Sequence, residues 1–374
     1  MNEEEMYDGT LAQTNTEQDT DKKCPSCSGT MEYDPATGGL MCPYCGHTES
    51  IEVKNGTKNE VAVDEQDFFA AVETESFDWG AEKKTVTCKA CGAVLVYDAL
   101  QNSEICAYCG SNQVMENNDE KTMKPGGVVP FKITEKQASE KFQEWIKGKW
   151  FCPNEAKRTA KAGKFKGIYL PYWTYDTNTV SEYVGQYGTE RRVTRRVNGK
   201  TVTETVIDWH NTSGVHKSFI NDYPVLASKN HDTRMLEGIL PFDTEDNKAY
   251  EPKFVAGFVS ERYAIGLKEG WEIAKPGIQE QLRSEVDAKI CDEHHTSHAR
   301  NIRLTTRYND LKYKYLLLPV WNSSFKYRDK VFNFMVNGQT GKVSGKSPIS
   351  PIKVAIAVIL GLIAAFILYK LIAS

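Results

Sequence analysis

Cys24-Pro-Ser-Cys27 is followed, after fourteen residues, by Cys42-Pro-Tyr-Cys45-Gly46. The same pattern returns as Cys88-Lys-Ala-Cys91, fourteen residues and Cys106-Ala-Tyr-Cys109-Gly110. A Tyr-Asp pair also recurs at the same offset, so the chain contains an internal repeat of 64 residues. This repeat decides the fold of the N-terminal third, where each copy has the pattern of a zinc ribbon.

Each copy has the spacing of a tetrahedral metal site. Two residues between paired cysteines form a tight knuckle that directs both sulfurs at one ion, and two knuckles supply four thiolates. Zn²⁺ is the expected ion; an iron or iron–sulfur site with the same ligands is the alternative. A redox pair is disfavoured because the four knuckles occur in matched pairs. The predicted ligands of two structural Zn²⁺ ions are Cys24, Cys27, Cys42 and Cys45, and Cys88, Cys91, Cys106 and Cys109.

Four thiolates leave no open coordination position for water, so both ions are expected to stabilise the ribbons and to perform no hydrolysis. A short hairpin is expected between the knuckles of each copy, turning at Gly38-Gly39 and at Gln101-Asn102. Thiolates must stay reduced to hold a metal, which favours the cytoplasm. We find no phosphate-binding loop, nucleophile elbow or dinucleotide fingerprint, and therefore expect no enzymatic activity.

The composition predicts a multidomain chain of two small all-β zinc ribbons with four cysteines each, an α+β region and one C-terminal transmembrane helix. Within the first linker, the segment from Asp64 to Trp79 has the pattern of a short amphipathic helix. It either docks a partner or packs its aromatic side chains on a ribbon. The predicted segments are a disordered acidic tail at 1–22, ribbon 1 at 23–48, a linker at 49–84, ribbon 2 at 85–111, a linker at 112–127, the α+β region at 128–340, a linker at 341–351 and the transmembrane helix at 352–373.

Local signals within the α+β region predict individual elements. An amphipathic helix capped by Thr134 is expected to run to Trp150, with Phe142, Trp145 and Ile146 on one face. The other signals are a hairpin at Arg195–Val202 around Asn198-Gly199, a turn at Asn337-Gly338, a helix at Ile278–Asp292 preceded by Pro276-Gly277, and strands within Lys314–Val336.

Two short motifs occur twice in this region. Val129-Pro130-Phe131 resembles Leu240-Pro241-Phe242, and Leu170-Pro171-Tyr172-Trp173 resembles Leu318-Pro319-Val320-Trp321. These echoes predict two related halves, 128–236 and 237–340. Each Leu-Pro-x-Trp motif is expected to start a strand whose tryptophan fills the core.

Three further groups of residues are candidate binding sites. Cys291, His294, His295 and His298 have the helical spacing of a metal site without the His-Glu-x-x-His order of a zinc protease; a polar helix end is the alternative. Arg191, Arg192, Arg195 and Arg196 are candidates for contact with an anion or a lipid headgroup, and a solvated hairpin is the alternative. The stretch from Lys157 to Lys166 reads as a basic loop, with a headgroup or RNA contact as the second interpretation.

The C-terminal segment has the composition of a membrane span. Val354 to Tyr369 is apolar without interruption, and with its flanking residues it is long enough to cross a hydrocarbon core of about 30 Å. Lys342, Lys346 and Lys353 precede it and Lys370 follows it, so the positive-inside tendency places the large N-terminal part in the cytoplasm. The expected protein is tail-anchored and crosses the cell membrane once.

The paired ribbons, Tyr-Leu-Pro-Tyr-Trp-Thr-Tyr at 169–175, Leu-Leu-Pro-Val-Trp at 317–321 and Val-Asn-Gly-Gln-Thr-Gly-Lys-Val at 336–343 together resemble the bacterial TFIIB-type zinc-ribbon proteins. Some members are labelled primosomal or helicase-like, whereas this sequence has no helicase motor motifs. Relatives with membrane helices resemble companions of phage-shock and flotillin-like membrane-stress proteins. The resemblance implies a scaffold role in a membrane-stress response.

Two functions are compared at this point, and a third class, an enzyme that uses the middle region, stays open because no sequence motif excludes an unfamiliar site. In the first, the ribbons bind a cytosolic protein and the C-terminal helix fixes the complex at the membrane. In the second, the ribbons bind nucleic acid in replication or transcription. The net charge of -4 gives no general attraction to nucleic acid, and there is no Lys or Arg between Cys24 and Thr48. The first function is therefore favoured, and no small-molecule substrate is indicated.

Overall fold

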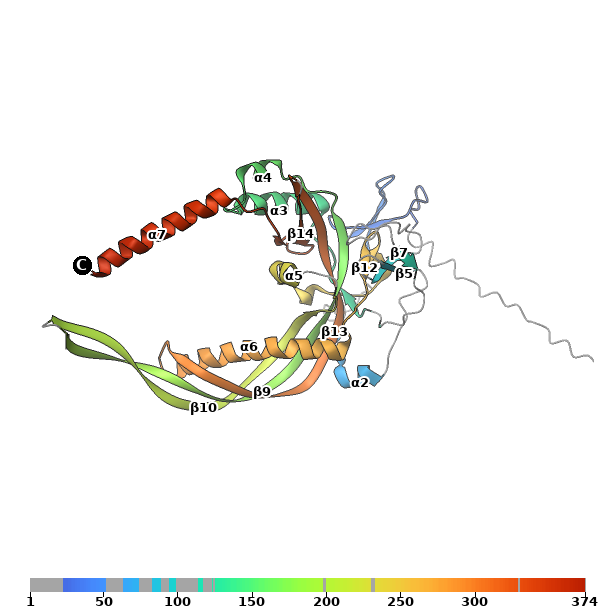
Figure 1. The fold of residues 1–374 in the computed structure, drawn as a ribbon. Coiled ribbons are helices and arrows are strands. Elements are labelled where there is room, and N and C mark those ends of the chain that lie inside the picture. The colour runs from blue at the N-terminus through green and yellow to red at the C-terminus, as the bar shows by residue number, and fades with distance from the viewer. Residues whose placement is uncertain are drawn as a thin grey trace, which may run out of the picture.

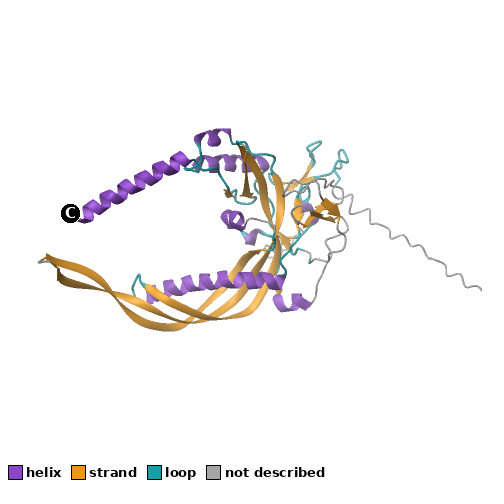
Figure 2. Cartoon of the chain, in the orientation of Figure 1, coloured by secondary structure: helices purple, strands orange, loops and turns teal. Residues whose placement is uncertain are grey.

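The computed structural model describes residues 23–51, 63–73, 83–88, 94–98, 114–116, 123, 125–197, 200–229, 233–328 and 330–373. Figures 1 and 2 show a β-rich body from which two arms project in the same general direction. One arm is the helix α7 (Pro351–Ala373). The other, which we call the strand arm, consists of the outer parts of β9 (Lys166–Val197), β10 (Lys200–Leu226) and β13 (Ala299–Tyr327), with α6 (Leu267–Glu293) lying along them.

The strand arm is built from three antiparallel strands in the order β10, β9, β13. At its far end Val197 pairs with Lys200, so the predicted hairpin is confirmed, although Asn198 and Gly199 lie outside the described residues. β13 joins β9 only as far out as the pairing of Ala299 with Tyr187. The strand arm is thus three-stranded near the body and two-stranded toward its end.

The burial of β13 changes along its length. From Ala299 to Asp310 its residues are exposed or partly buried, as in a strand with one face in solvent. From Tyr313 to Trp321 every residue is buried, so this part has protein on both faces. The transition coincides with a bulge between Asn309 and Lys312 in β13, and a second bulge lies between Ile220 and Tyr223 in β10. These irregularities mark the base of the strand arm.

The body sheet continues β9 and β13 with shorter strands. Its order is β11-β8-β13-β9-β12-β6-β5-β7, and β4 and β14 also pair with β13. The additional strands are β4 (Gln66–Asp67), β5 (Lys83–Cys88), β6 (Val94–Asp98), β7 (Val114–Glu116), β8 (Gly127–Val128), β11 (Lys248–Ala249), β12 (Val259–Glu261), β14 (Lys330–Asn337) and β15 (Val343–Gly345).

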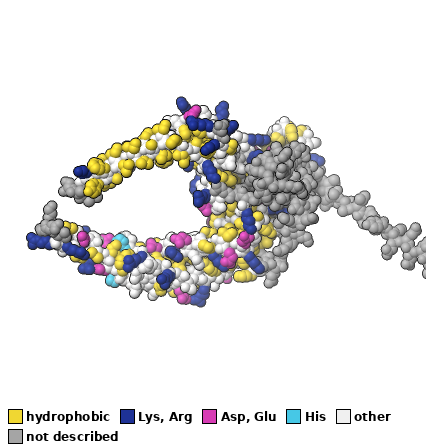
Figure 3. Space-filling view, in the orientation of Figure 1, with side chains coloured by type: hydrophobic (Ala, Val, Ile, Leu, Met, Phe, Trp, Pro, Cys, Tyr) yellow, Lys and Arg dark blue, Asp and Glu magenta, His cyan; other side chains and the backbone are white. Residues whose placement is uncertain are grey.

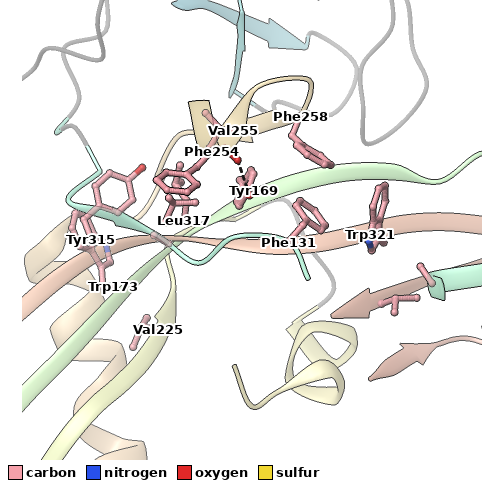
Figure 4. Packing of buried hydrophobic residues seen from close by; sticks show 14 of the residues in the cluster. Phe131, Tyr169, Trp173, Val225, Phe254, Val255, Phe258, Tyr315, Leu317 and Trp321 are labelled. Carbon is pink, nitrogen blue, oxygen red and sulfur yellow. Dashed lines mark hydrogen bonds between the residues drawn. The ribbon is translucent and has the colours of Figure 1, made fainter. Parts of the chain in front are cut away.

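Alternate residues of β9 and β13 supply two core layers, one on each face of the sheet. On the first face Tyr169 and Trp321 pack with Phe131 and Phe258, whereas Trp173 packs on Tyr315. The Tyr169 hydroxyl donates to the Phe254 carbonyl at 3.1 Å (Figure 4). The second face carries the even-numbered residues and is covered by α5 (Thr233–Ile239). Its members are Ile168, Leu170, Tyr172, Leu316, Leu318 and Val320.

The helix α3 (Glu135–Gly148) follows its sequence pattern closely. The Thr134 side chain accepts from the backbone of Gln137, whose side chain accepts in turn from the Thr134 backbone, which is a complete capping box. Phe142 and Ile146 are fully buried on one face. The predicted cap and face are confirmed, and the helix ends two residues before Trp150. Helix α4 (Asn154–Thr159) and the short 3-10 turns η1 (Thr244–Asp246) and η2 (Pro252–Val255) complete the body.

We expect Thr134→Ala to lower the free energy of unfolding by about 1 kcal/mol, because it removes one half of the capping box. Chemical denaturation of the full chain in detergent measures this change. Thr159→Ala is the matched control, since Thr159 is an exposed residue at the C-terminal end of a different helix, α4. An equal loss in both variants would show that the cap does not stabilise α3.

The prediction for α6 is wrong at its start. The helix begins at Leu267 and continues through Pro276 and Gly277, where the sequence suggested a helix start. A buried stripe that includes Trp271, Ala274 and Ile278 stabilises the helix through tertiary packing, which outweighs the hydrogen bond lost at proline. Gly277 packs closely on Tyr223, because a Cβ at this position would clash with the Tyr223 hydroxyl oxygen.

The two Leu-Pro-x-Trp motifs meet in the sheet, where Leu170 pairs with Leu318. Both tryptophans are buried, and their indole N–H groups donate to the carbonyls of Ile265 at 2.8 Å and Ile133 at 2.7 Å. Their role in the core is thus as expected. The first motif lies near the start of β9, whereas the second lies toward the end of β13, against expectation. The predicted boundary between residues 236 and 237 falls inside α5.

The segment predicted as the first linker is anchored to the body. The predicted amphipathic helix from Asp64 is wrong at its start, because Gln66–Asp67 form β4 and the helix α2 (Phe68–Glu73) begins only after them. Phe77 and Trp79 lie outside the described residues. Phe68 is buried against Tyr175 and Trp271, with ring centroids 6.4 Å from each. Phe68 therefore packs on the base of the strand arm and not on a ribbon.

Candidate metal centre and buried charge cluster

The first ribbon is a three-stranded sheet of β1 (Glu32–Asp34), β2 (Gly39–Met41) and β3 (Thr48–Glu49). The Asp34 carboxylate accepts from the backbone N–H of Ala36 and Thr37 and so shapes the β1–β2 turn. Gly38 adopts the left-handed conformation at φ +70°, and Gly39 already pairs with Asp34. The predicted Gly38-Gly39 turn is confirmed.

The two knuckles have the same backbone geometry. The N–H of Ser28 donates to the Cys24 carbonyl at 2.7 Å, and the N–H of Gly46 donates to the Cys42 carbonyl at 2.9 Å. Ser28 and Gly46 both have positive φ, at 58° and 76°. Each knuckle therefore closes on itself, which lets its two sulfurs turn toward the same point.

The four sulfurs of this ribbon fit one metal ion. All four Sγ atoms lie within 4.8 Å of one another, with 3.4 Å between Cys24 and Cys45 and 3.5 Å between Cys27 and Cys42. A tetrahedral Zn²⁺ site with Zn–S bonds of about 2.3 Å needs sulfurs about 3.8 Å apart. Cys24 and Cys42 are buried whereas Cys27 and Cys45 are exposed, so the site lies at the surface of the ribbon. A cysteine cluster that could hold a metal ion is therefore present near the N-terminus.

The electrostatics of the quartet also favour a cation. Burial opposes ionisation of Cys42, but hydrogen bonds from the backbone N–H groups of Cys45 and Tyr44 lower its pKa to about 7. At Cys45 the backbone N–H of His47 favours the thiolate, yet the adjacent thiols of Cys24 and Cys27 raise its pKa to about 12. Four neighbouring sulfurs cannot all ionise without a positive charge between them, and a divalent metal supplies it.

The ribbon is fixed to the body. The backbone N–H of Tyr33 donates to the Ala256 carbonyl at 3.0 Å, and its buried ring lies 6.2 Å from that of Phe254. Met31 is fully buried in a cluster with Leu40 and Ala256. Tyr44, between the closing cysteines, has 79% of its surface exposed.

The second predicted site falls mostly outside the described residues. Cys88 ends β5, whereas Cys91, Cys106 and Cys109 and the Gln101-Asn102 turn are not described. The strands on either side of the first knuckle pair through Thr87 and Val94. In the first ribbon Lys23 pairs with Thr30, each 64 residues earlier.

The candidate site at Cys291 does not gather its ligand atoms. Within the described part of the chain, only the ribbon quartet brings three or more potential ligand atoms within 4.8 Å of one another. The His294 ring stacks on Tyr187 at 3.6 Å, and His298 Nε2 lies 2.9 Å from Glu190. His295 has a positive φ just after α6. These side chains close the helix end onto the strand arm.

The four arginines lie on β9 toward the end of the strand arm and are all exposed. Arg191 contacts Asp208 through two nitrogens, at 2.7 and 3.3 Å, and Arg195 lies 3.8 Å from Glu204. Half of the set therefore forms cross-strand ion pairs, as in a solvated hairpin.

A buried charge cluster at the base of the strand arm was missed in the sequence. Lys314 Nζ lies 2.7 Å from Asp222, 3.7 Å from Asp176 and 3.8 Å from Glu65. Lys314, Asp176 and Asp222 are all buried. The cluster lies beside an open cavity of about 520 Å³ that is lined in part by Glu65, Asp222 and Lys314. Because its members come from four distant segments, no local spacing could have revealed it.

The carboxylates and the lysine of this cluster shift each other's pKa values. Burial opposes the charge of Lys314, but the hydrogen bond to Asp222 and the charge of Asp176 raise its pKa overall. Burial is also the main cause at Asp176, where it raises the pKa to about 6 although the Asp222 N–H and Lys314 act against it. The cluster thus holds a positive lysine among carboxylates, one of which accepts a proton readily.

We expect Asp176→Asn to remove part of the pH dependence of stability. The folded pKa of Asp176 is raised to about 6, above the value of 3.8 for an exposed aspartate, so its contribution is present below pH 3.8 and is lost as the pH rises through 6. Between pH 4 and pH 7 the free energy of unfolding should fall by on the order of 1–2 kcal/mol more in the wild type than in the variant. Denaturation at several pH values measures this difference, with the exposed Asp287→Asn as control. Parallel pH profiles for wild type and Asp176→Asn would contradict it.

Comparison with known proteins gives one informative relative. No family model matches the chain, and no solved structure matches it. The chain is similar to the uncharacterized protein YdjG of Bacillus subtilis (strain 168), with 28% identity over 342 residues. The similarity covers 89% of this chain and 91% of YdjG.

Proposed function

We propose that the protein is a membrane-anchored zinc-ribbon scaffold that recruits a cytosolic protein to the membrane, in a membrane-stress response. The observation that carries this proposal is α7, whose apolar side chains have no protein around them. Its segment Pro351–Lys370 is 0% buried, and it is the one helix of the described residues that is long and apolar enough to span a membrane. At about 1.5 Å per residue, the 23 residues of α7 cover about 34 Å, enough for a hydrocarbon core of about 30 Å.

The first ribbon offers a surface suited to a protein partner. Tyr44 is exposed beside the sulfur quartet, and no lysine or arginine occurs from Cys24 to Thr48. Zn²⁺ with four thiolates carries a formal charge of about −2, which adds to the acidic side chains Glu32, Asp34 and Glu49. Such a surface repels phosphate and favours an aromatic or basic protein contact.

A second Zn²⁺ ion in ribbon 2 is part of the same proposal. The pairing of Thr87 with Val94 repeats that of Lys23 with Thr30, and β6 joins the body sheet where Val96 pairs with Ser260. Both ribbons would then be fixed to one body. Reduced thiolates, and the lysines that precede α7, favour a cytoplasmic location for this part.

Affinity capture from detergent-solubilised membranes tests the proposal. The wild-type chain should recover a partner from the membrane fraction, Cys42→Ser should lose it, and a chain ending at Ser350 should move to the soluble fraction. Cys291→Ser is the control, since Cys291 lies at the end of α6 away from the quartet. Recovery of the same proteins by all four chains would exclude recruitment through ribbon or anchor.

Binding of nucleic acid is the second candidate, favoured by the exposed arginines at the end of the strand arm. Arg192 and Arg196 are exposed there, and neither is within ion-pair distance of a described carboxylate. Titration of the full chain with DNA and RNA across salt concentrations distinguishes the candidates. A steep loss of affinity with salt supports nucleic-acid binding, whereas no binding at low salt supports the scaffold.

A further inference from the structure

The chain between α3 and β9 forms a strongly basic corner, which we define as residues 147–166. Seven lysines and arginines occur in it against one carboxylate, Glu155. That carboxylate accepts from the Tyr327 hydroxyl at 2.9 Å and lies 3.7 Å from Arg328, so it is engaged outside the corner. The basic residues are Lys147, Lys149, Lys157, Arg158, Lys161, Lys164 and Lys166.

Much of this positive charge is uncompensated. Lys157 Nζ donates to the Lys147 carbonyl, and Lys149 lies over the Trp145 ring at 4.7 Å, so neither is neutralised by a carboxylate. Among the described residues, no carboxylate lies within ion-pair distance of Arg158, Lys161 or Lys164, all of which are exposed. The basic corner therefore presents a positive surface that suits an anionic partner.

Two aromatic side chains project from the same corner. Trp150 is 53% exposed and Phe151 is 45% exposed, with their rings edge to face at 4.8 Å. Ile349, which precedes α7, is 68% exposed. Large exposed aromatics beside lysines are typical of side chains at the boundary between lipid and water.

Hydrogen bonds join the basic corner to the first turn of α7. The Ser350 N–H donates to the Phe151 carbonyl at 2.8 Å, and Lys353 Nζ donates to the Cys152 carbonyl at 2.8 Å and to Asn154 Oδ1 at 2.7 Å. The apolar run begins at the next residue, Val354. Figure 3 shows Lys and Arg side chains gathered where the apolar helix leaves the body.

The position at the root of α7 decides where the corner lies relative to a membrane. The strand arm runs in the same general direction as α7 (Figures 1 and 3). The helix leaves the body at Ser350 and Pro351, where the Ser350 N–H donates to the Phe151 carbonyl. Because the corner lies at the root of α7, it lies at the bilayer surface when α7 spans the bilayer.

We propose that the basic corner is a binding surface for anionic phospholipid headgroups. Trp150 and Phe151 enter the headgroup region, and Arg158, Lys161 and Lys164 contact lipid phosphates. This inference rests on the proposed function, since α7 must first span the bilayer. It adds a preference for anionic lipid, because a basic residue near an anionic surface is attracted to it.

The test uses the full chain in lipid nanodiscs with brominated acyl chains, made of phosphatidylcholine alone or with about 30 mol % phosphatidylglycerol. Bromine quenches the fluorescence of tryptophan that reaches the bilayer. Trp150→Phe should lose most of the quenching, whereas Trp209→Phe, at the strand arm, should not. A further set of discs contains equal amounts of the two lipids, and only one of them carries bromine. Bromine on phosphatidylglycerol should then quench more strongly than bromine on phosphatidylcholine, on the order of twofold.

The charge contribution is tested by replacing Arg158, Lys161 and Lys164 together with glutamine. This triple variant should lose the preference for phosphatidylglycerol, and the triple replacement of Lys268, Lys275 and Arg283 on α6 should keep it. Extraction at alkaline pH reports separately whether α7 is inserted. An inserted chain whose quenching is unaffected by Trp150→Phe would overturn the headgroup proposal and leave the anchor intact.

Two other outcomes also overturn it. A chain that alkaline extraction removes from the discs has no spanning helix, so anchor and headgroup proposals fail together. The second outcome is equal quenching by both lipids, together with binding of an added RNA oligonucleotide that depends on Arg158, Lys161 and Lys164. It would show that the basic corner binds nucleic acid and not lipid headgroups.

Discussion

Cys42→Ser is expected to remove one bound zinc ion and to unfold the first ribbon. A serine hydroxyl is a poor ligand for Zn²⁺, and the three remaining sulfurs leave the site open. Structural zinc binds such peptides with about 10–16 kcal/mol at neutral pH, and a segment as short as 23–51 cannot fold on its small core alone. Tyr33 and Met31 would then lose their positions against the body.

Elemental analysis of protein purified without added metal measures this effect. The wild type and Cys291→Ser should carry about two zinc equivalents per chain, and Cys42→Ser about one, if each ribbon holds its own ion. Protection of the Tyr33 amide from hydrogen exchange should fall in Cys42→Ser alone. Iron in place of zinc, or disulfides within the quartets, would refute the proposed centre.

Lys314→Met should be the most destabilising change within the body. Lys314 is the one lysine within ion-pair distance of both Asp176 and Asp222 in the described residues, and all three are buried. Methionine matches the length of the side chain but leaves the carboxylates without a counter-charge. Removing one partner from a buried ion pair costs about 3–5 kcal/mol, which is a large part of the stability of most domains.

The neighbouring Lys312 provides a matched control. Its Nζ lies 2.9 Å from Glu65, but its side chain is 47% exposed, so Lys312→Met should cost no more than about 1 kcal/mol. Urea denaturation of the full chain in detergent compares the two variants. Adding Asp222→Asn to Lys314→Met should restore part of the loss. Equal losses in the two lysine variants would mean that burial does not strengthen the Lys314 interactions.

The elements that could be predicted from the sequence are those specified by residues close together. Four cysteines within 22 positions define the first ribbon, and one threonine with a glutamine three residues later defines the start of α3. Asn198-Gly199 between alternating residues locates the hairpin of the strand arm. In each case the deciding interaction spans a few residues, so local chemistry outweighs tertiary context.

The features that were missed depend on contacts between distant segments. Pro276 and Gly277 suggest a helix start, and only the burial of Trp271, Ala274 and Ile278 against distant strands explains why α6 continues through them. The buried charges of Glu65, Asp176, Asp222 and Lys314 meet only after the strands have paired. The length of β9 was also missed, because alternation shows that a strand exists but not how far its partners extend.

The unequal lengths of β9 and β13 have a consequence for proteolysis. Beyond Tyr187, β9 pairs with β10 alone. An isolated hairpin of two strands is only marginally stable in water. That outer section should open locally far more often than the section backed by β13 and α6. Its arginines are trypsin sites, so brief digestion should cleave the outer section of the strand arm before the section that β13 and α6 cover.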